Sequence, residues 1–355
     1  MNKTLLLKTL PKVINNYFND RPINSVTEIK VTHVCNQRCR QCNIYKDKSK
    51  PIHLSFPKYK KICKNLNNYG ALVGMISGGE PLLNPEINQI LLHSLKIFPL
   101  SVSLVTGLYF PYEKIADTIS LCLKNNINLQ TSLDALGKKS EYIRGVKNHS
   151  KIVLENMKKI AEEKEKLGSD SFLYANSVLS NLNLEQIPEI IKASKKAGWK
   201  TTIGVYHSLI ERTNEDDEMK ITDSDKFYET VEFLKDNPDV LNLNTFIEGL
   251  PRVLEHNFPD YCPFIQGKRT STRLTIYENG DLYLCGGKSI GNLLDEDLTT
   301  ILESEIYAKR LQEYKNCHGC WSSCYTQKHL LFHPKNLAQS LHNISKLLNL
   351  KSAAR

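Results

Sequence analysis

The sequence predicts an α/β fold in two parts, a series of parallel βα units followed by a smaller, cysteine-rich α+β domain. Six short β-type runs alternate with helical stretches between residues 26 and 207, which is the order of parallel strands joined by crossover helices. The alternation then stops, and five of the ten cysteines lie in residues 256–329. Six strands are too few to close an eight-stranded barrel, so an open doubly wound sheet and a partial barrel both fit.

The strand-like runs and the helical stretches follow one another in order. Proline in the first turn favours helix starts at Phe56-Pro57 and Asn84-Pro85, and Asn183 is expected to cap the last helix of the series. In either sheet architecture, ligands bind at the C-terminal ends of the strands. The runs begin near Val26, Ala71, Ser101, Ile127, Phe172 and Trp199, and the helical stretches cover residues 57–69, 84–98, 111–125, 145–167 and 183–197.

Both ends of the sequence are predicted to be helical. Residues 1–25 form an amphipathic segment that places Leu6, Leu10 and Ile14 on one side. We expect this segment to cap the bottom of the core, with contact to a membrane surface as the less favoured alternative. Residues 330–355 combine a helix that has leucines at helical spacing with a basic tail, and docking on the core is again favoured over membrane contact.

A linker separates the βα series, residues 26–207, from the cysteine-rich part. Residues 208–255 begin acidic and polar and then predict helices. Residues 256–329 contain a strong hairpin signal, because Asn279-Gly280 lies between the alternating runs 273–277 and 281–285. A hairpin beside five cysteines indicates a small domain in which thiols bind a metal or a cluster.

Composition excludes several classes of protein. The 355 residues are 41% hydrophobic and 24% charged, which is ordinary for a globular protein and argues against disorder or a collagen-like fibre. The N-terminus offers only Leu5, Leu6 and Leu7 as an apolar run, shorter than the roughly 7–15 residues of a signal-peptide core. No apolar run approaches the roughly 20 residues of a membrane span. The sequence therefore predicts a cytoplasmic protein with reduced thiols, and a disulfide framework is disfavoured.

The formal net charge of +9 is unevenly distributed. Residues 35–65 carry nine Lys or Arg and one Asp, and residues 328–355 carry five Lys or Arg and no acid. Solvated lysine faces are the favoured interpretation, and a site for an anionic substrate or an acidic membrane surface is the alternative. No nucleic-acid partner is expected, because these basic residues are not interleaved with aromatic ones as in recognition modules.

The first cysteine group directly follows the first predicted strand. Cys35, Cys39 and Cys42 have the spacing C-x3-C-x2-C, which lets one loop bind a single metal or cluster. Three thiolates are one ligand fewer than the four usual for an iron–sulfur cluster or a structural zinc ion. A cluster bound in this way leaves one iron open, and an open iron can bind a substrate or a cofactor.

This motif after the first strand of a βα series resembles that of the radical S-adenosylmethionine (SAM) enzymes. The resemblance implies a partial (β/α)6 TIM-like barrel over residues 26–207 and a [4Fe-4S] cluster held by Cys35, Cys39 and Cys42. It also implies that the amino and carboxylate groups of SAM chelate the fourth iron. One electron from the cluster then cleaves SAM and yields a 5′-deoxyadenosyl radical, which abstracts a hydrogen atom from the substrate.

Further segments resemble motifs of the same family at the ends of later strands. Ser77-Gly78-Gly79-Glu80-Pro81 resembles the GGE motif, which receives the SAM amino group; glycines let backbone approach a ligand closely, and a carboxylate suits an ammonium group. Ser132-Leu133-Asp134 resembles the segment near the SAM ribose and carboxylate. For Arg144 two roles stay open, contact with the SAM carboxylate or with a nearby acid. The cofactor-binding residues implied in this way are Gly78, Gly79, Glu80, Ser132, Asp134, Arg144 and Asn176.

Two positions depart from the family pattern. The residue before the last cysteine is usually aromatic and lies near the adenine, but here it is Gln41, which puts the adenine contacts in doubt. Tyr45 is the nearby residue that could compensate. Thr106-Gly107 on the third strand resembles a shortened form of the common Thr-Asn-Gly. The cysteine motif itself shows no such departure.

The second cysteine group lies in the C-terminal part of the sequence. On chemistry alone, four of its five thiolates could bind structural zinc or an iron–sulfur cluster. The two cysteines outside both groups, Cys63 and Cys122, lie in predicted helices with apolar neighbours and are expected to be buried structural thiols. The members of the second group are Cys262, Cys285, Cys317, Cys320 and Cys324.

Beside the first group, the pattern Cys…Gly-x4-Cys followed by C-x2-C resembles the SPASM or twitch extension of radical SAM enzymes. The full SPASM form holds two auxiliary clusters and has more cysteines. The resemblance therefore implies one auxiliary [4Fe-4S] cluster here, with Cys262, Cys285, Cys317 and Cys320 as the best match. Cys324 either replaces one of these ligands or binds nothing.

Together the two groups predict a radical SAM oxidoreductase or maturase whose auxiliary cluster supports oxidation or radical bond formation. The favoured substrate is a small molecule such as a sugar, a lipid or an antibiotic precursor, with an anionic group as one option. A peptide- or protein-modifying maturase is the alternative, less favoured because 25 residues before the first predicted strand are too few for a peptide-recognition domain. A non-enzymatic zinc or iron–sulfur binding module is a remote alternative.

The sequence does not identify the catalytic acid or base. Tyr206, His207 and Tyr325 lie near the predicted functional loops, and for His207 a structural role is equally favoured. The partners expected from the resemblance are SAM, an unknown substrate and an external electron donor such as flavodoxin or ferredoxin.

Overall fold

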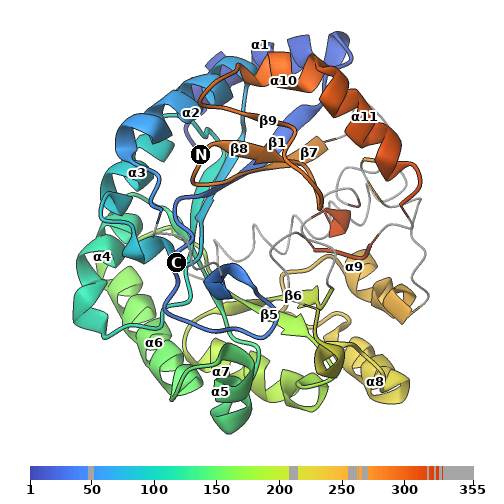
Figure 1. The fold of residues 1–355 in the computed structure, drawn as a ribbon. Helices are drawn as coiled ribbons and strands as arrows, with labels where there is room; N and C mark the ends of the chain where they lie inside the picture. Colours follow the sequence, from blue (N-terminus) through green and yellow to red (C-terminus); the bar gives the residue numbers. More distant parts are fainter. Residues whose placement is uncertain are drawn as a thin grey trace.

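One curved, nine-stranded sheet forms the centre of the protein, with helices on its outer side (Figure 1). The strand order is β6-β5-β4-β3-β2-β1-β7-β8-β9. The structure is a computed structural model that describes residues 1–46, 52–207, 215–254, 262, 264–265, 271–317, 320–323, 325–327 and 330. The helix predicted within residues 330–355 lies, except for Leu330, outside the described residues. Among those residues, no helix combines the length and the apolar character that crossing a membrane requires.

The first six strands pair in parallel and form a partial barrel, so the predicted series of βα units is confirmed. Each strand begins within three residues of its expected start. The strands are β1 (Ile23–Lys30), β2 (Val73–Ser77), β3 (Ser101–Val105), β4 (Asn128–Ser132), β5 (Leu173–Leu179) and β6 (Lys200–Val205).

The outer face of this sheet is apolar because the helices cover it. Ile29, Ile76 and Leu104 are fully buried at alternate positions of their strands. Gly74 lies on the same face of β2 as Ile76, and a Cβ atom on it would lie 2.3 Å from the Phe98 ring. The helices between these strands are α2 (Phe56–Tyr69), α3 (Ile87–Ser94), α4 (Ala116–Lys124), α5 (Gly137–Arg144), α6 (His149–Leu167) and α7 (Ile187–Lys196), and the others are α1 (Lys3–Phe18), α8 (Ser224–Leu234), α9 (Asn244–Glu248), α10 (Leu298–Glu303) and α11 (Glu305–Tyr314).

The cysteine-rich part extends the sheet of the βα series. β7 (Ser271–Ile276) pairs in parallel with β1, and β8 (Asp281–Tyr283) and β9 (Gly291–Asn292) follow in antiparallel pairing. The predicted hairpin between β7 and β8 is confirmed, and Gly280 takes the positive φ of 93° that its turn requires. The boundaries 26–207 and 256–329 stay predictions, but the sheet runs across both parts without interruption (Figure 1).

The inner face of the sheet is polar. Glu28 and Lys30 on β1 and Tyr174 on β5 are half-buried at the positions that alternate with the apolar outer residues. Burial raises the pKa of Tyr174, and two groups oppose this effect: Ser103, which bonds to the Tyr174 hydroxyl, and the charge of Arg273 on β7, at the other end of the parallel series. Strands so far apart in the sheet approach each other only if the sheet curls. This polar face is therefore the concave one.

A buried ion pair joins β1 to β7 on this inner face. The Arg273 guanidinium binds the Glu28 carboxylate at 2.5 Å, and the Ser77 hydroxyl donates to the same carboxylate at 2.6 Å. Burial alone would raise the pKa of Glu28, but the charges of Arg273 and Lys30 and the hydrogen bonds outweigh it and lower the pKa to about 2. The pair therefore contributes to the contact between the two parts of the sheet.

We expect Glu28→Gln to destabilise the protein in a pH-dependent way. The Glu28 pKa is lower in the folded protein, so its contribution is complete above the ordinary pKa of 4.5 and is lost as the pH falls towards about 2. A lowering of the Glu28 pKa from 4.5 to about 2 corresponds to a contribution of roughly 3 kcal/mol to the free energy of unfolding. Urea titrations of both proteins from pH 7 to pH 3 will show a stability difference that shrinks on acidification; a difference independent of pH would contradict the assignment.

Helix starts differ from two of the sequence predictions. α3 begins at Ile87 and not at Asn84-Pro85, because the Asn84 amide is used to bind the backbone oxygens of Val31 and Leu54, at 2.8 and 3.1 Å. Asn183 makes no side-chain cap on α7; its side chain bonds to other loop backbone, as described below. Both asparagines thus fix long-range contacts where a local cap was expected.

The N-terminal helix α1 lies against the end of α2, as the cap prediction requires. Its contacts are polar, however: Asn16 Nδ2 donates to the Tyr69 oxygen at 2.8 Å, and Lys12 Nζ donates to the Asn67 oxygen at 2.7 Å. Its apolar side chains remain largely exposed, with Phe18 at 75% relative accessibility. The burial of the apolar side that the prediction expected is therefore wrong for the described residues.

Candidate active site

A single loop after β1 carries the first cysteine group. Cys39 is buried, and Cys35 and Cys42 are half-buried. The loop backbone is held on one side by the GGE segment, where Glu80 N donates to the Val34 oxygen at 2.8 Å. On the other side it is held by α5, where Arg38 N donates to the Arg144 oxygen at 3.0 Å. The sequence-predicted segments therefore meet at the C-terminal ends of the parallel strands, as expected.

The three thiols lie close enough to affect one another electrostatically. Burial raises the pKa of Cys35 to about 12, and the charges of Glu80, Cys39 and Cys42 act in the same direction. Burial also raises the pKa of Cys39, while Arg144 opposes part of this effect. Thiolates that repel one another in this way are stabilised by a bound cation. The donor set fits a metal cluster.

The two glycines of the GGE segment allow the cysteine loop to lie directly on β2. A Cβ atom on Gly78 would be 2.5 Å from the Thr32 oxygen, and one on Gly79 would be 2.3 Å from the Val34 oxygen. Both obstacles are backbone atoms of the loop, which cannot rotate away. From the sequence we expected these glycines to let a ligand come close to the backbone. In the structure it is the cysteine loop that comes close to them.

We expect Gly79→Ala to displace the cysteine loop and to reduce binding of the first cluster. The clash with the Val34 backbone can be relieved only by moving β2 and the loop apart. Iron content after anaerobic reconstitution should fall towards half that of the unchanged protein. Gly204→Ala is the matched control, since its added Cβ would lie 3.5 Å from the nearest atom, Ser323 Oγ. Full iron content in Gly79→Ala would contradict this reading.

Glu80 is fully buried and bonded to the protein itself. Its carboxylate accepts hydrogen bonds from Thr106 Oγ1 at 2.7 Å, Gly107 N at 2.8 Å and Leu82 N at 3.1 Å. Burial raises its pKa to about 7, against the effect of these three bonds. Glu80 therefore fixes the turn after β3 relative to β2. Its contact with the SAM amino group stays a prediction.

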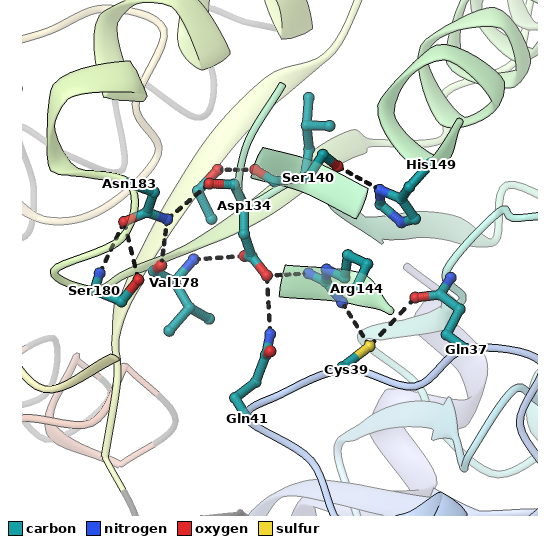
Figure 2. A network of polar contacts seen from close by, with 12 residues as sticks. Gln37, Cys39, Gln41, Asp134, Ser140, Arg144, His149, Val178, Ser180 and Asn183 are labelled. Carbon is teal, nitrogen blue, oxygen red and sulfur yellow. Dashed lines mark hydrogen bonds and ion pairs between the residues drawn. The ribbon is translucent and has the colours of Figure 1, made fainter. Parts of the chain in front are cut away.

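Asp134 is the centre of a buried polar network at the end of β4 (Figure 2). One carboxylate oxygen binds Arg144 Nη2 at 2.5 Å and Gln41 Nε2 at 2.9 Å, and the other accepts from Val178 N at 2.9 Å. Arg144 also extends towards Cys39, with Nη1 at 3.6 Å from its sulfur. Arg144 thus pairs with a nearby acid, and its contact with the SAM carboxylate stays a prediction.

Gln41 and Asn183 both form hydrogen bonds to Asp134 in the same network. Gln41, which stands where the family has an aromatic residue, binds Asp134 with its amide and thereby ties the cysteine loop to β4 (Figure 2). Asn183 Nδ2 donates to the backbone oxygen of Asp134 at 2.7 Å, and Asn183 Oδ1 accepts from Ser180 N at 2.8 Å. Sequence reasoning missed this role of Asn183 because Asn before a helix is an ordinary cap signal.

Ser132 and Asn176 are neighbours in register on β4 and β5. Asn176 Oδ1 accepts a hydrogen bond from Thr202 Oγ1 on β6 at 3.1 Å. Both residues are half-buried on the inner face. Their place, beside the Asp134 network, agrees with the expected position of a cofactor site, and their contact with SAM stays a prediction.

The second cysteine group surrounds a cavity of about 170 Å³. Cys262, Cys285, Cys317 and Cys320 line it, which are the four cysteines that the SPASM resemblance favoured. Burial raises the pKa of Cys320 to about 12, and the other three thiols add to this effect, so all four lie within electrostatic reach. The donor set and the size of the cavity fit an iron–sulfur cluster. Cys324 lies outside the described residues.

A direct contact links the loop of the first cysteine group to the hairpin of the cysteine-rich part. His33, two residues before Cys35, is buried with Nδ1 at 3.0 Å from Glu278 Oε1 in the β7–β8 turn. Trp321 docks the second group on the linker helices, because its indole nitrogen donates to the Phe246 oxygen at 2.8 Å. The cysteine cavity is therefore held in a fixed position relative to the barrel.

Comparison with protein families decides the identity. The model described as the radical SAM superfamily matches residues 29–193, and the iron–sulfur cluster-binding SPASM domain matches residues 262–324. The chain contains a radical SAM domain followed by a SPASM domain. The resemblance stated from the cysteine and GGE motifs is confirmed, and so is the prediction of an enzyme. No curated protein matches the sequence.

Solved structures of radical SAM enzymes share the fold. Streptococcus suis SuiB bound to S-adenosylmethionine has a TM-score of 0.61 and 16% identity, over 92% of this chain and 79% of that protein. Native anSMEcpe with bound AdoMet and the Cp18Cys peptide has a TM-score of 0.54 and 14% identity, over 94% of this chain and 100% of that protein. These likenesses establish the partial barrel followed by a C-terminal domain.

As a radical SAM enzyme with a SPASM domain, the protein binds a [4Fe-4S] cluster and SAM in the first domain and auxiliary iron–sulfur clusters in the second. The predicted cofactors are thereby confirmed. Cys35, Cys39 and Cys42 would hold the first cluster, and the four cysteines of the cavity would hold an auxiliary one. The individual ligands, and the number of auxiliary clusters, stay predictions.

Proposed function

We propose that this radical SAM enzyme abstracts a hydrogen atom from a polar, anionic substrate bound on the inner face of the sheet, between the two cysteine groups. Lys30 carries the proposal. Its ammonium group lies 4.9 Å from the centre of the Tyr277 ring and forms no ion pair within the part of the chain that the structure describes. An aromatic ring does not neutralise the lysine charge, so an anionic group of the substrate can pair with it.

The surrounding charges support this assignment. Lys30 ends β1 where the cysteine loop begins, and Tyr277 directly follows β7. Glu28 and Arg273 on the same face bind each other, and Lys30 also acts on the Glu28 carboxylate, so these three groups together keep one net positive charge. Within the basic stretch 35–65, the lysines on α2 do not supply the site, because they are exposed on the outer side of the barrel.

In this proposal the residues of the chain bind and position, and the cofactors carry the radical chemistry. Lys30 orients the substrate by its anionic group, and the Asp134–Arg144 network keeps the cysteine loop in place at the end of β4. When bound, the first cluster and SAM supply the radical that abstracts hydrogen from the substrate. An external electron donor such as flavodoxin or ferredoxin belongs to the proposal as the source of the required electron.

The anionic group could belong to a small molecule or to a peptide. The sequence favours a sugar, lipid or antibiotic precursor. The peptide alternative is supported by two similar structures, SuiB bound to its precursor peptide SuiA, with a TM-score of 0.61 and 16% identity, and anSMEcpe with the Cp18Cys peptide. We retain the small molecule as the first candidate and the peptide as the second, and the experiment separates them.

The test measures 5′-deoxyadenosine formed by the anaerobically reconstituted enzyme with SAM and dithionite. Extracts are separated by anion exchange and by size, and each fraction is tested for stimulation of product formation. We expect stimulation by an anionic fraction of low molecular mass. Prior digestion of the fraction with protease removes the stimulation only if the substrate is a peptide.

Lys30→Met provides the specific control. We expect it to lose at least about tenfold of the stimulated rate, the effect of roughly 1.4 kcal/mol of lost binding, while unstimulated SAM cleavage is unchanged. Lys30→Arg, which keeps the charge, should retain part of the stimulation. Stimulation by neutral or cationic fractions, or full stimulation of Lys30→Met, would refute the anionic substrate without affecting the family assignment.

A further inference from the structure

One wall of the cysteine cavity comes from the barrel. His207, two residues after β6, lines the cavity together with Cys262, Cys285, Cys317 and Cys320. Its Nδ1 is buried and has no hydrogen-bond partner among the described residues. We propose that His207 donates an imidazole N–H hydrogen bond to a sulfur atom of the auxiliary cluster and thereby raises the reduction potential of that cluster.

The tyrosines of the same wall are committed elsewhere. The Tyr314 hydroxyl accepts from Cys285 N at 3.2 Å and donates to the Gly286 oxygen at 3.3 Å. The Tyr325 hydroxyl donates to the Leu284 oxygen at 2.6 Å. Both protons thus point to backbone oxygens of the residues on either side of Cys285, and the rings supply an apolar lining. His207 differs from both tyrosines because its buried nitrogen is unsatisfied within the described residues.

The end of β6 is close to the segment that carries the last cysteines. A Cβ atom built on Gly204 would lie 3.5 Å from Ser323 Oγ, which is ordinary van der Waals contact. Residues 204–207 therefore lie against the segment 320–323, and this contact places the His207 imidazole on the cavity. The barrel supplies this imidazole, and the four thiols come from the C-terminal part.

The composition of the cavity assigns His207 the role of a donor and not of a ligand. Four cysteines complete the ligand set of a [4Fe-4S] cluster. A neutral imidazole carries one N–H donor and one acceptor, and a buried nitrogen without a partner costs free energy. Cluster sulfides and cysteine sulfurs are acceptors, and they are the groups that this cavity would place beside the ring.

The expected consequence is a change in redox behaviour. Reduction adds one negative charge to the cluster, and a hydrogen bond to sulfur stabilises the more negative state. Removal of the donor should therefore lower the reduction potential. The inference rests on the auxiliary cluster of the SPASM domain and is independent of the proposed substrate.

The experiment isolates the auxiliary cluster in the full chain by replacing Cys35, Cys39 and Cys42 with alanine. In this background, redox titration followed by electron paramagnetic resonance compares His207 with His207→Phe and His207→Gln. We expect His207→Phe to shift the midpoint potential to a more negative value with unchanged iron and sulfide content. His207→Gln keeps an N–H donor and should recover part of the shift. His93→Gln, on α3 outside the barrel, should shift nothing.

A second measurement does not depend on substitution. In protein labelled with 15N-histidine, electron–nuclear double resonance of the reduced auxiliary cluster should show a weak nitrogen coupling, which disappears in His207→Phe. An unchanged potential in His207→Phe, or no coupling in the labelled parent, would overturn the proposal. Loss of auxiliary iron in His207→Gln, or a strong coupling typical of an iron–nitrogen bond, would also overturn it by making His207 a ligand.

Discussion

Replacing Cys35, Cys39 and Cys42 together with alanine will abolish SAM cleavage while the second cluster remains. The three thiols lie on one loop, within electrostatic reach of one another, and burial raises the pKa of Cys35 to about 12, so they need a bound cation to become thiolates. With two [4Fe-4S] clusters, the iron content should fall from about eight to about four per chain. Iron and sulfide analysis, together with 5′-deoxyadenosine formation under dithionite, measures both effects.

The matched control removes thiols that lie away from both sites. Cys63 on α2 and Cys122 on α4 are fully buried in the outer core, and Cys63→Ala with Cys122→Ala should leave the iron content unchanged. Four irons per chain before substitution would refute the auxiliary cluster. Residual SAM cleavage in the triple variant would refute the assignment of the first group.

Arg144→Met will destabilise the protein by about 3–5 kcal/mol, the cost of leaving one partner of a buried ion pair uncompensated. Arg144 and Asp134 are 8% and 1% exposed, and their contact fixes α5 against β4 and the cysteine loop. Urea unfolding of the reconstituted protein measures the change in free energy. Because Arg144 also reaches Cys39, iron bound at the first site should be lost at lower urea concentration than in the unchanged protein.

A double-mutant cycle separates the pair from its surroundings. Asp134→Asn with Arg144→Met should cost less than the sum of the single changes, because no unpaired charge stays buried. Arg21→Met breaks the solvent-exposed pair with Glu303, whose carboxylate is 52% exposed, and should cost no more than about 1 kcal/mol. Equal costs for Arg144→Met and Arg21→Met would contradict the structural role of the Asp134–Arg144 pair.

Patterns that act over a short stretch of sequence were predicted well. The strands of the barrel begin close to their expected positions, since runs of β-branched and aromatic residues between helical stretches depend on local propensity. Asn279-Gly280 predicted its hairpin for the same reason, because the turn requires a residue that tolerates positive φ. The four thiols that the SPASM resemblance favoured all line one cavity, whereas Cys324 lies outside the described residues.

Features that depend on contacts between distant residues were not predicted. Asn84 and Asn183 carry ordinary cap signals, yet their amides bind backbone brought in from other strands and loops. The choice of partner for Arg144 could not be made either, since two roles were equally compatible with its position in the motif. The burial expected for the apolar side of α1 was wrong, because amphipathic spacing does not specify which face meets the core.

By itself, the sequence determined the radical SAM and SPASM resemblance and the two cysteine groups, because metal-ligand spacing and glycine motifs are local and chemically restrictive. Only the tertiary structure decided that β7 joins β1, that Glu28 meets Arg273, and that His207 lines the cysteine cavity. Glu28 and Arg273, for example, are 245 residues apart in the sequence. No local propensity links such positions, and Glu28 meets Arg273 because β7 pairs with β1 in the sheet.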